Sequence, residues 1–127
     1  MSLTSDDAQN LATYLSQITE HTELEALALV TRDGMRIAFS AVPGYEINPD
    51  HLSSMSAVIL QSSVEAVEKI GYNFLSECVI RGDRGSFLVL AAAGRFFLIG
   101  ASRTVQDLSK VVSVFRYYAK KIAETYP

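Results

Sequence analysis

The residue types that most often carry chemistry are few in this sequence, and their spacing does not assemble a catalytic site. Cys78 is the single cysteine, and it lies in an apolar segment with no base that can be placed beside it, which is typical of a small hydrophobic side chain. His21 and His51 stand in polar flanks, where a surface or capping role is more common than metal ligation. Glu65 and Glu68 lie three residues apart on one predicted helix, as on a solvated helix face. We therefore expect no catalytic, cofactor-binding or metal-binding residue.

The short motifs that mark nucleotide and metal sites are also missing. The sequence contains no GxxxxGK[ST] phosphate loop, no GxGxxG, and no CxxC, HExxH or GxSxG. Asp33 and Asp83 fit turns, which explain them. Arg84 and Arg95 fall at predicted hairpin tips, where an arginine can contact an acidic partner or a phosphate but is more often solvated. The sequence favours an interaction module over an enzyme.

Composition excludes several further classes of protein. The chain has 127 residues, of which 49% are hydrophobic and 20% charged, as expected of one globular domain spanning residues 1–127. The net charge is −3 and the eleven Lys and Arg are scattered, whereas nucleic-acid binding requires a basic stripe. There is no apolar run of about 20 residues for a membrane span, and the first ten residues lack the features of a signal peptide. With a single cysteine, we expect a cytoplasmic protein without membrane insertion.

Three helices are predicted by apolar residues that recur every three or four positions, over residues 6–20, 51–70 and 105–125. Ser5, Asp50 and Thr104 are suitable N-caps, because a short polar side chain can accept the free N–H groups of a first turn. Gly71 is a suitable residue just after the second helix, because it adopts a positive φ without strain.

Alternation and short apolar runs predict five strands, over residues 24–31, 35–42, 73–81, 86–92 and 96–101. Asp33-Gly34 predicts a two-residue type I′ turn between the first two strands. The last two strands are apolar on both faces, which requires helices on both faces of the sheet. The first strand must pair with the last, because two separate hairpins would be marginal. The predicted fold is α+β, in the order α-β-β-α-β-β-β-α, with a five-stranded antiparallel sheet that has one helix on one face and two on the other.

Helix 51–70 has a wider apolar arc than one sheet requires. The arc covers roughly half of the circumference, against about 100° for a helix that packs on one surface. One stripe comprises Leu52, Met55, Ile59, Ala66 and Ile70, and a second comprises Ser53, Ala57, Leu60, Val64 and Val67. We expect the second stripe to have no partner within the chain, which predicts a subunit interface. The alternative is a helix deep in a monomer core.

Three stretches of the sequence carry a family resemblance. They are EALALVTRDGMRIAFS, the Ala- and Ser-rich helix 51–70, and SECVIRGDRGSFLVLAAAGRFFLIGAS followed by DLSKVVSVFRYYAKKI. In that order they resemble the opening hairpin, the second helix, and the last three strands and final helix of the Roadblock (dynein light-chain type) family. The resemblance covers about residues 5–123 and extends to prokaryotic, MglB-like members. Longin and profilin-like domains share much of this architecture.

The resemblance implies a dimer in which the second helices pair and the third strands join edge to edge. The partner is then a second copy of the chain or a Roadblock paralogue. We expect the dimer interface to comprise Ser53, Ala57, Leu60, Gln61, Val64, Val67, Leu75, Ser76, Glu77, Cys78 and Val79. The resemblance further implies a non-enzymatic scaffold that binds a small Ras-like GTPase through its dimer surface.

Two other functions stay open at this point. The chain can be a subunit of a heteromeric complex, such as a dynein-type cargo adaptor, with no GTPase partner. It can also be a small-molecule sensor of the PAS or GAF kind, but such a sensor needs converging polar groups in its cavity. The predicted strands at 86–92 and 96–101 supply almost none.

Overall fold

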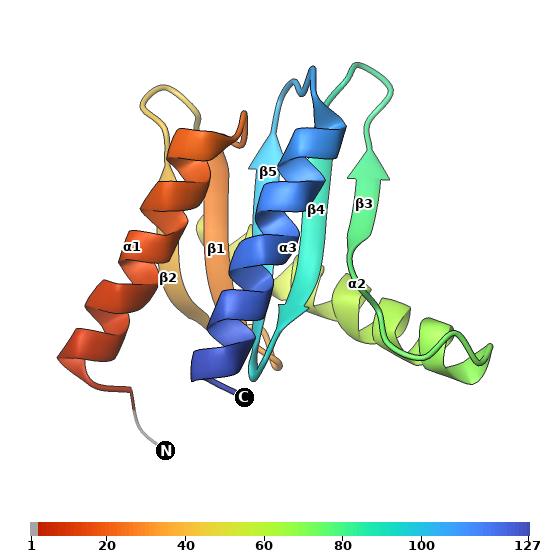
Figure 1. Ribbon diagram of the computed structural model, residues 1–127. Helices are drawn as coiled ribbons and strands as arrows, with labels where there is room; N and C mark the ends of the chain where they lie inside the picture. The colour runs from red at the N-terminus through yellow and green to blue at the C-terminus, as the bar shows by residue number, and fades with distance from the viewer. Residues whose placement is uncertain (1–2) are drawn as a thin grey trace.

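The structure is a computed structural model, and it describes residues 3–127. Along the chain it contains α1 (Ser5–His21), β1 (Ala26–Thr31), β2 (Arg36–Ala41), α2 (Pro49–Lys69), β3 (Cys78–Arg81), β4 (Phe87–Ala93), β5 (Phe96–Ser102) and α3 (Leu108–Thr125). The strands form one antiparallel sheet in the spatial order β2-β1-β5-β4-β3. Figure 1 shows α1 and α3 on one face and α2 on the other. The predicted fold class and order of elements are confirmed.

The first and last strands meet in the middle of the sheet. Ala26 lies opposite Ala101, and Thr31 lies opposite Phe96. Every residue of β5 is buried, because helices cover both faces of this central strand. The structure thus confirms that the first strand pairs with the last, and it leaves β2 and β3 as the edges of the sheet.

Two apolar cores lie on opposite faces of the sheet. The core under α1 and α3 contains Leu11, Leu15, Ile18, Leu27, Leu29, Val89, Leu98, Val111, Phe115 and Ile122. The core under α2 is smaller and contains Ala26, Ala28, Val30, Leu52, Ala57, Leu60, Leu90, Phe97 and Ile99. A single helix thus has to cover one whole face of the sheet.

The helices begin close to the predicted positions but use other caps. The observed N-caps are Thr4, Asn48 and Asp107, instead of Ser5, Asp50 and Thr104. Thr4 forms a capping box with Asp7, since each side chain accepts a hydrogen bond from the backbone N–H of the other. Several polar residues compete at each helix start, and the cap is the one whose oxygen reaches the N–H groups of the first turn.

The first hairpin has a three-residue loop. The N–H of Thr31 donates to the carbonyl of Met35, and the N–H of Gly34 donates to the carbonyl of Thr31, so that residues 32–34 form the loop. Gly34 has a φ of +92°, whereas Asp33 does not adopt a positive φ. A type I′ turn needs positive φ at both central residues. The predicted two-residue turn is therefore wrong, and the observed loop is of the longer type that places a left-handed glycine before the second strand.

Candidate interaction surface

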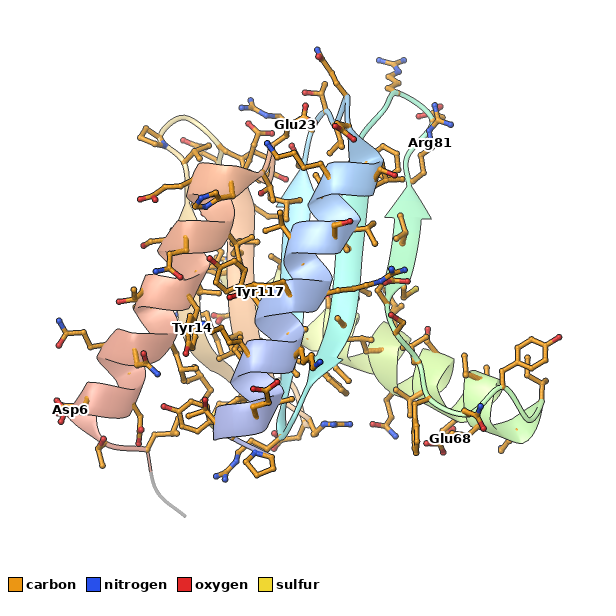
Figure 2. The ribbon with its side chains drawn as sticks, viewed as in Figure 1. Asp6, Tyr14, Glu23, Glu68, Arg81 and Tyr117 are labelled. Atoms are coloured by element: carbon orange, nitrogen blue, oxygen red, sulfur yellow. The ribbon has the colours of Figure 1, made fainter. Side chains whose placement is uncertain are left out.

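The second half of α2 extends away from the sheet. The buried residues of this helix are Leu52, Ser53, Ser56, Ala57 and Leu60, and none follows Leu60. At 1.5 Å per residue, the helix continues for about 13 Å beyond its last buried side chain. Figure 1 shows it passing β3 and leaving the edge of the sheet, and Figure 2 shows Glu68 far from the body. We call residues 61–74 the arm.

The end of the arm exposes large apolar side chains. The exposed fraction is 62% for Ile70, 72% for Tyr72 and 86% for Phe74. We call these three exposed side chains, which lie within five residues of one another in the sequence, the apolar tip, and exposed large apolar side chains grouped in this way are typical of an interaction site.

A defined cap holds this tip in place. Gly71 has a φ of +81°, and its N–H donates to the carbonyl of Glu68, while the N–H of Tyr72 donates to the carbonyl of Val67. These two bonds make a Schellman motif, which satisfies free carbonyls at the helix end. The predicted role of Gly71 is confirmed, and the apolar tip lies on an ordered turn.

Strand β3 has one free edge. It pairs with β4 alone, and Val79 and Ile80 are 38% and 39% exposed. The predicted strand over 73–81 is too long, because Asn73 takes a φ of +68° and interrupts the extended backbone. A short edge strand with free N–H and C=O groups and apolar side chains can pair with another chain.

A groove of about 320 Å³ runs along the first half of α2, on the same face of the sheet. It is lined by Ile47, Asn48, His51, Leu52, Met55, Ser56, Ile59 and Leu88, and its walls are mainly apolar. The hydroxyl of Ser56 is buried, and no residue in 3–127 gives it a hydrogen-bond partner. Buried polar atoms are nearly always paired, so the hydroxyl of Ser56 is an exception in the packing under α2.

The ion pair of Glu25 and Arg103 stabilises one wall of this groove. The carboxylate of Glu25 accepts hydrogen bonds from the backbone N–H of Arg103 at 2.8 Å and from its Nε at 3.1 Å. These bonds lower the pKa of Glu25 to about 2. The guanidinium of Arg103 also lies 5.0 Å from the ring centre of Tyr45. This cation–π contact holds the loop that carries Ile47.

A second ion pair fixes the segment that leads into β3. Arg116 on α3 binds the Glu77 carboxylate through Nε and Nη2, the latter at 3.1 Å. This bond to Arg116 is the main reason why the pKa of Glu77 lies below its usual value. The hydroxyl of Ser76 donates to the same carboxylate at 3.1 Å. Of the predicted interface residues, Glu77 therefore has a partner within the chain.

The structure corrects the orientation predicted for α2. Ser53, Ala57 and Leu60 are 1%, 4% and 0% exposed, so the expectation that their stripe has no partner in the chain is wrong for them. Met55, expected against the sheet, is 62% exposed. The small side chains explain this, because they allow the helix to approach the sheet closely. A Cβ atom added to Gly34 would lie 3.5 Å from that of Ala57, in ordinary van der Waals contact.

The other predicted interface residues lie at or near the surface. Gln61, Ser76 and Val79 are exposed. Five are half-buried, namely Val64, Val67, Leu75, Glu77 and Cys78. Their place in an interface stays a prediction. The sequence analysis did not include Tyr72 and Phe74 in the interface. Two aromatic residues just after the glycine that ends α2 were a visible signal of an exposed apolar site.

The arrangement offers contact surfaces rather than reactive groups. Within residues 3–127 there is no cluster of three His, Cys, Asp or Glu side chains placed to hold a metal ion. Over the same residues, no helix is long and apolar enough to cross a membrane. The features that stand out as contact surfaces are the free edge of β3 and the projecting second half of α2.

Residues 11–101 match the model of the Roadblock/LC7 domain, and the chain belongs to this family. Similar solved structures include "MglB with tetrameric arrangement", with 19% identity, a TM-score of 0.86, and coverage of 99% of this chain and 94% of that one. The gliding protein MglB of Thermus thermophilus has 18% identity, a TM-score of 0.85 and coverage of 99% and 95%. Acanthamoeba castellanii profilin IA has 17% identity, a TM-score of 0.56 and coverage of 90% and 97%.

No curated protein sequence matches the chain. The family match confirms the resemblance found in the sequence, and the structural likenesses confirm a profilin-like Roadblock fold similar to that of MglB proteins. Family membership places the chain among regulatory or adaptor domains rather than catalytic ones.

Proposed function

We propose that this chain is a non-enzymatic scaffold that forms a homodimer through β3 and the arm, and that the dimer surface binds a small Ras-like GTPase. The observation that carries the proposal is that the arm ends in exposed apolar side chains. Its apolar tip, with Phe74 86% exposed, has no core of its own and projects beside the free edge of β3 (Figure 1). A second copy can cover both features at once.

The apolar tip is large enough to drive association. Burial of a large apolar side chain contributes about 1.5–3 kcal/mol, and a two-fold dimer buries the tip of each chain. Ile70, Tyr72 and Phe74 from both chains then contribute at most about 9–18 kcal/mol in total, since each is already partly buried in the single chain. That is comparable to the association cost of about 4–15 kcal/mol. Strand pairing along β3 adds main-chain hydrogen bonds and sets the orientation.

The proposed interface differs from the sequence-based one in one half of α2. Ser53, Ala57 and Leu60 belong to the core of the single chain. The interface is instead formed by the exposed or half-buried residues Gln61, Val64, Val67, Leu75, Ser76, Cys78 and Val79, with the apolar tip added. A similar structure is described as MglB with a tetrameric arrangement, which supports association between copies.

The GTPase as partner is supported by membership of the Roadblock/LC7 family and by likeness to MglB proteins. Members of this family serve as platforms for Ras-like GTPases, which act in the cytoplasm. A platform acts by positioning its partner, so it needs a shaped surface rather than a catalytic group. We accordingly expect the dimer to bind the GTPase and organise it without hydrolysing GTP itself.

Light scattering and a binding titration test the proposal. The wild type at micromolar concentration should have twice the 13.9 kDa mass of the chain. Purified small Ras-like GTPases of the source organism, loaded with GDP or a GTP analogue, should bind it saturably. Val64→Asp should become monomeric and lose this binding, because a charge in the interface is costly. Lys120→Asp, on the exposed surface of α3, is the matched control and should keep both properties.

Two outcomes would contradict the proposal in different ways. If the wild type is a monomer at tens of micromolar, the proposed homodimer is wrong. A stable homodimer that binds none of the organism's small GTPases would remove the partner. A chain that associates only with a Roadblock paralogue would instead support a heteromeric adaptor.

A further inference from the structure

We infer that the seam between α1 and α3 is a second docking surface, and that it binds a proline-rich segment of a partner protein in the extended polyproline II conformation. The surface is formed by Tyr14 of α1 and by Tyr117 and Tyr118 of α3, which we call the tyrosine row. It lies on the face of the sheet opposite α2 (Figure 1). The inference therefore goes beyond the proposed dimer and its GTPase, and the surface stays free when that dimer forms.

The rings of the tyrosine row contact one another across the seam. The ring centre of Tyr118 lies 6.0 Å from that of Tyr14 and 5.1 Å from that of Tyr117, where the two rings meet edge to face. Both distances fall in the range of about 4.5–7 Å for interacting aromatic rings. Tyr14 and Tyr118 are half-buried, whereas Tyr117 is 58% exposed. Figure 2 shows Tyr14 and Tyr117 in the region between the two helices.

A groove of about 310 Å³ adjoins the tyrosine row, and we call it the seam groove. Its walls are mainly apolar and are formed by Tyr117, Tyr118 and Val114, with His21, Lys110 and Ser113 at the rim. The Nζ atom of Lys121 lies 5.4 Å from the ring centre of Tyr117, and this cation–π contact restrains the ring. The single chain thus already holds an aromatic wall beside an open apolar groove.

This chemistry favours a stiff, apolar ligand with free carbonyl groups. Grooves lined by aromatic side chains bind proline-rich segments in several recognition domains. A polyproline II helix is largely formed before it binds, so it loses little conformational entropy on docking. Its carbonyl groups make no internal hydrogen bonds, and the hydroxyl groups of the tyrosine row can donate to them.

The charges around the seam groove do not favour an acidic ligand instead. His21 and Lys110 lie at the rim, but Glu20, Glu23 and Asp107 adjoin the same two residues. Side chains of opposite sign therefore offset each other at this end of the seam. An acidic peptide or an anionic surface gains little from such a mixture of charges, which leaves the aromatic rings as the basis of recognition.

The length of the seam sets the size of the ligand. The stretch of α3 from Lys110 to Lys121 is about 16 Å long. A polyproline II segment advances about 3.1 Å per residue, so about five residues cover this stretch. Residues three apart in such a segment point to the same side, so two prolines with this spacing can face the tyrosine row together.

A peptide titration by calorimetry tests the inference. The probe is a peptide of about ten prolines with blocked ends, and the wild type should bind it saturably. A glycine–serine peptide of the same length is flexible and should not bind. Tyr117→Ala should raise the dissociation constant for the proline peptide about tenfold or more, because exposed tyrosines often carry much of the binding energy of a surface. Tyr117→Phe keeps the ring and should raise it by less than about threefold.

Tyr72→Ala is the matched control. Tyr72 is 72% exposed and lies on the arm, so this variant also removes an exposed tyrosine but leaves the seam intact. It should bind the proline peptide with unchanged affinity. Circular dichroism should show that Tyr117→Ala folds like the wild type, because the side chain of Tyr117 is largely in solvent.

Three results would overturn the inference. The first is a wild type that does not bind the proline peptide at millimolar concentration. The second is equal weakening by Tyr72→Ala and Tyr117→Ala, or equal binding of the glycine–serine peptide, because the contact is then on the arm or non-specific. The third is a leucine-rich helical peptide that binds the seam more tightly than the proline peptide, which would assign the surface to a helical partner. None of these results bears on the proposed dimer or GTPase, which light scattering and the GTPase titration decide separately.

Discussion

Helix α3 buries side chains along its whole length, from Val111 near its start to Ile122 in its last turn, whereas α2 buries none after Leu60. The face under α1 and α3 is also closed by contacts between helices. The rings of Tyr14 and Tyr118 lie 6.0 Å apart, and Figure 2 shows Tyr14 in the seam between α1 and α3.

The difference follows from the number of helices available to each face. Two helices side by side can cover five strands, but one helix leaves the strands at one edge uncovered. On the α2 face the uncovered part is the groove at Leu88, next to the free edge of β3. The face under α1 and α3 is thus covered within the chain, whereas the face under α2 is partly uncovered and can be covered by a second molecule.

Aspartate introduced at two positions four residues apart on α2 should have the largest difference in effect, on folding at one position and on dimerisation at the other. Leu60 is fully buried, so Leu60→Asp leaves an unpaired carboxylate in the core and should lower the free energy of unfolding by at least about 3–5 kcal/mol. Val64 is only half-buried, so Val64→Asp should fold and lose the dimer. Urea denaturation and light scattering measure the two effects, and Lys120→Asp, at an exposed position of α3 outside the proposed interface, should change neither.

This contrast would be lost if α2 packed with its other stripe on the sheet. In that case Met55→Asp, at a position 62% exposed, would unfold the chain while Leu60→Asp would only break the dimer. Circular dichroism of the two variants, recorded below the dimer dissociation constant, distinguishes the two orientations.

The same substitution at two phenylalanines compares the face covered by α1 and α3 with the arm of α2. Phe115 is fully buried under α3, and Phe115→Ala should lower the free energy of unfolding by about 3–5 kcal/mol, because it removes a ring and leaves a cavity. Phe74 lies on the arm, and Phe74→Ala should change the stability of the monomer by less than about 0.5 kcal/mol. At concentrations where the chain is a dimer, the difference between the two variants in lost unfolding free energy should become smaller, since Phe74→Ala then loses interface contacts. Equal effects in the monomer would mean that the arm folds back on its own chain.

The layers of the fold could be predicted because β4 and β5 are apolar on both faces, which only a sheet covered on both sides explains. The orientation of α2 on the sheet could not be predicted from the sequence. Both of its stripes are apolar, so hydrophobic periodicity gives no preference between them. The decision depends on steric fit, since Ser53 and Ala57 are small enough to approach the hairpin at Gly34.

The length of β3 and the shape of the groove could not be predicted from the sequence. The length of β3 depends on Asn73, whose positive φ overrides an alternating pattern, as asparagine tolerates this conformation better than most residues. The groove is lined in part by Ile47 and Asn48, in a loop whose Tyr45 lies against Arg103 from a distant part of the chain. Such contacts between distant parts of the chain leave no local signal in the sequence.

The smallest expected effect concerns the ion pair that holds the groove wall. The pKa of Glu25 is lowered from 4.5 to about 2 by its hydrogen bonds to Arg103, so the carboxylate stabilises the folded state above pH 4.5 and this contribution is lost as the pH falls toward 2. Arg103 is 60% exposed, so solvent screening keeps the contribution small. The difference in unfolding free energy between wild type and Glu25→Gln should shrink as the pH falls through this window, and it should not change between about pH 6 and 8.

The same pair should affect association more than folding. Because it fixes Tyr45 and the loop beside the groove, Glu25→Gln should weaken the dimer more than it destabilises the monomer, as measured by light scattering and urea denaturation. Glu124→Gln, at an exposed position near the end of α3, is the control, since it removes the same charge on the opposite face of the sheet. An equal weakening of the dimer by this variant would show that net charge rather than the groove wall controls association.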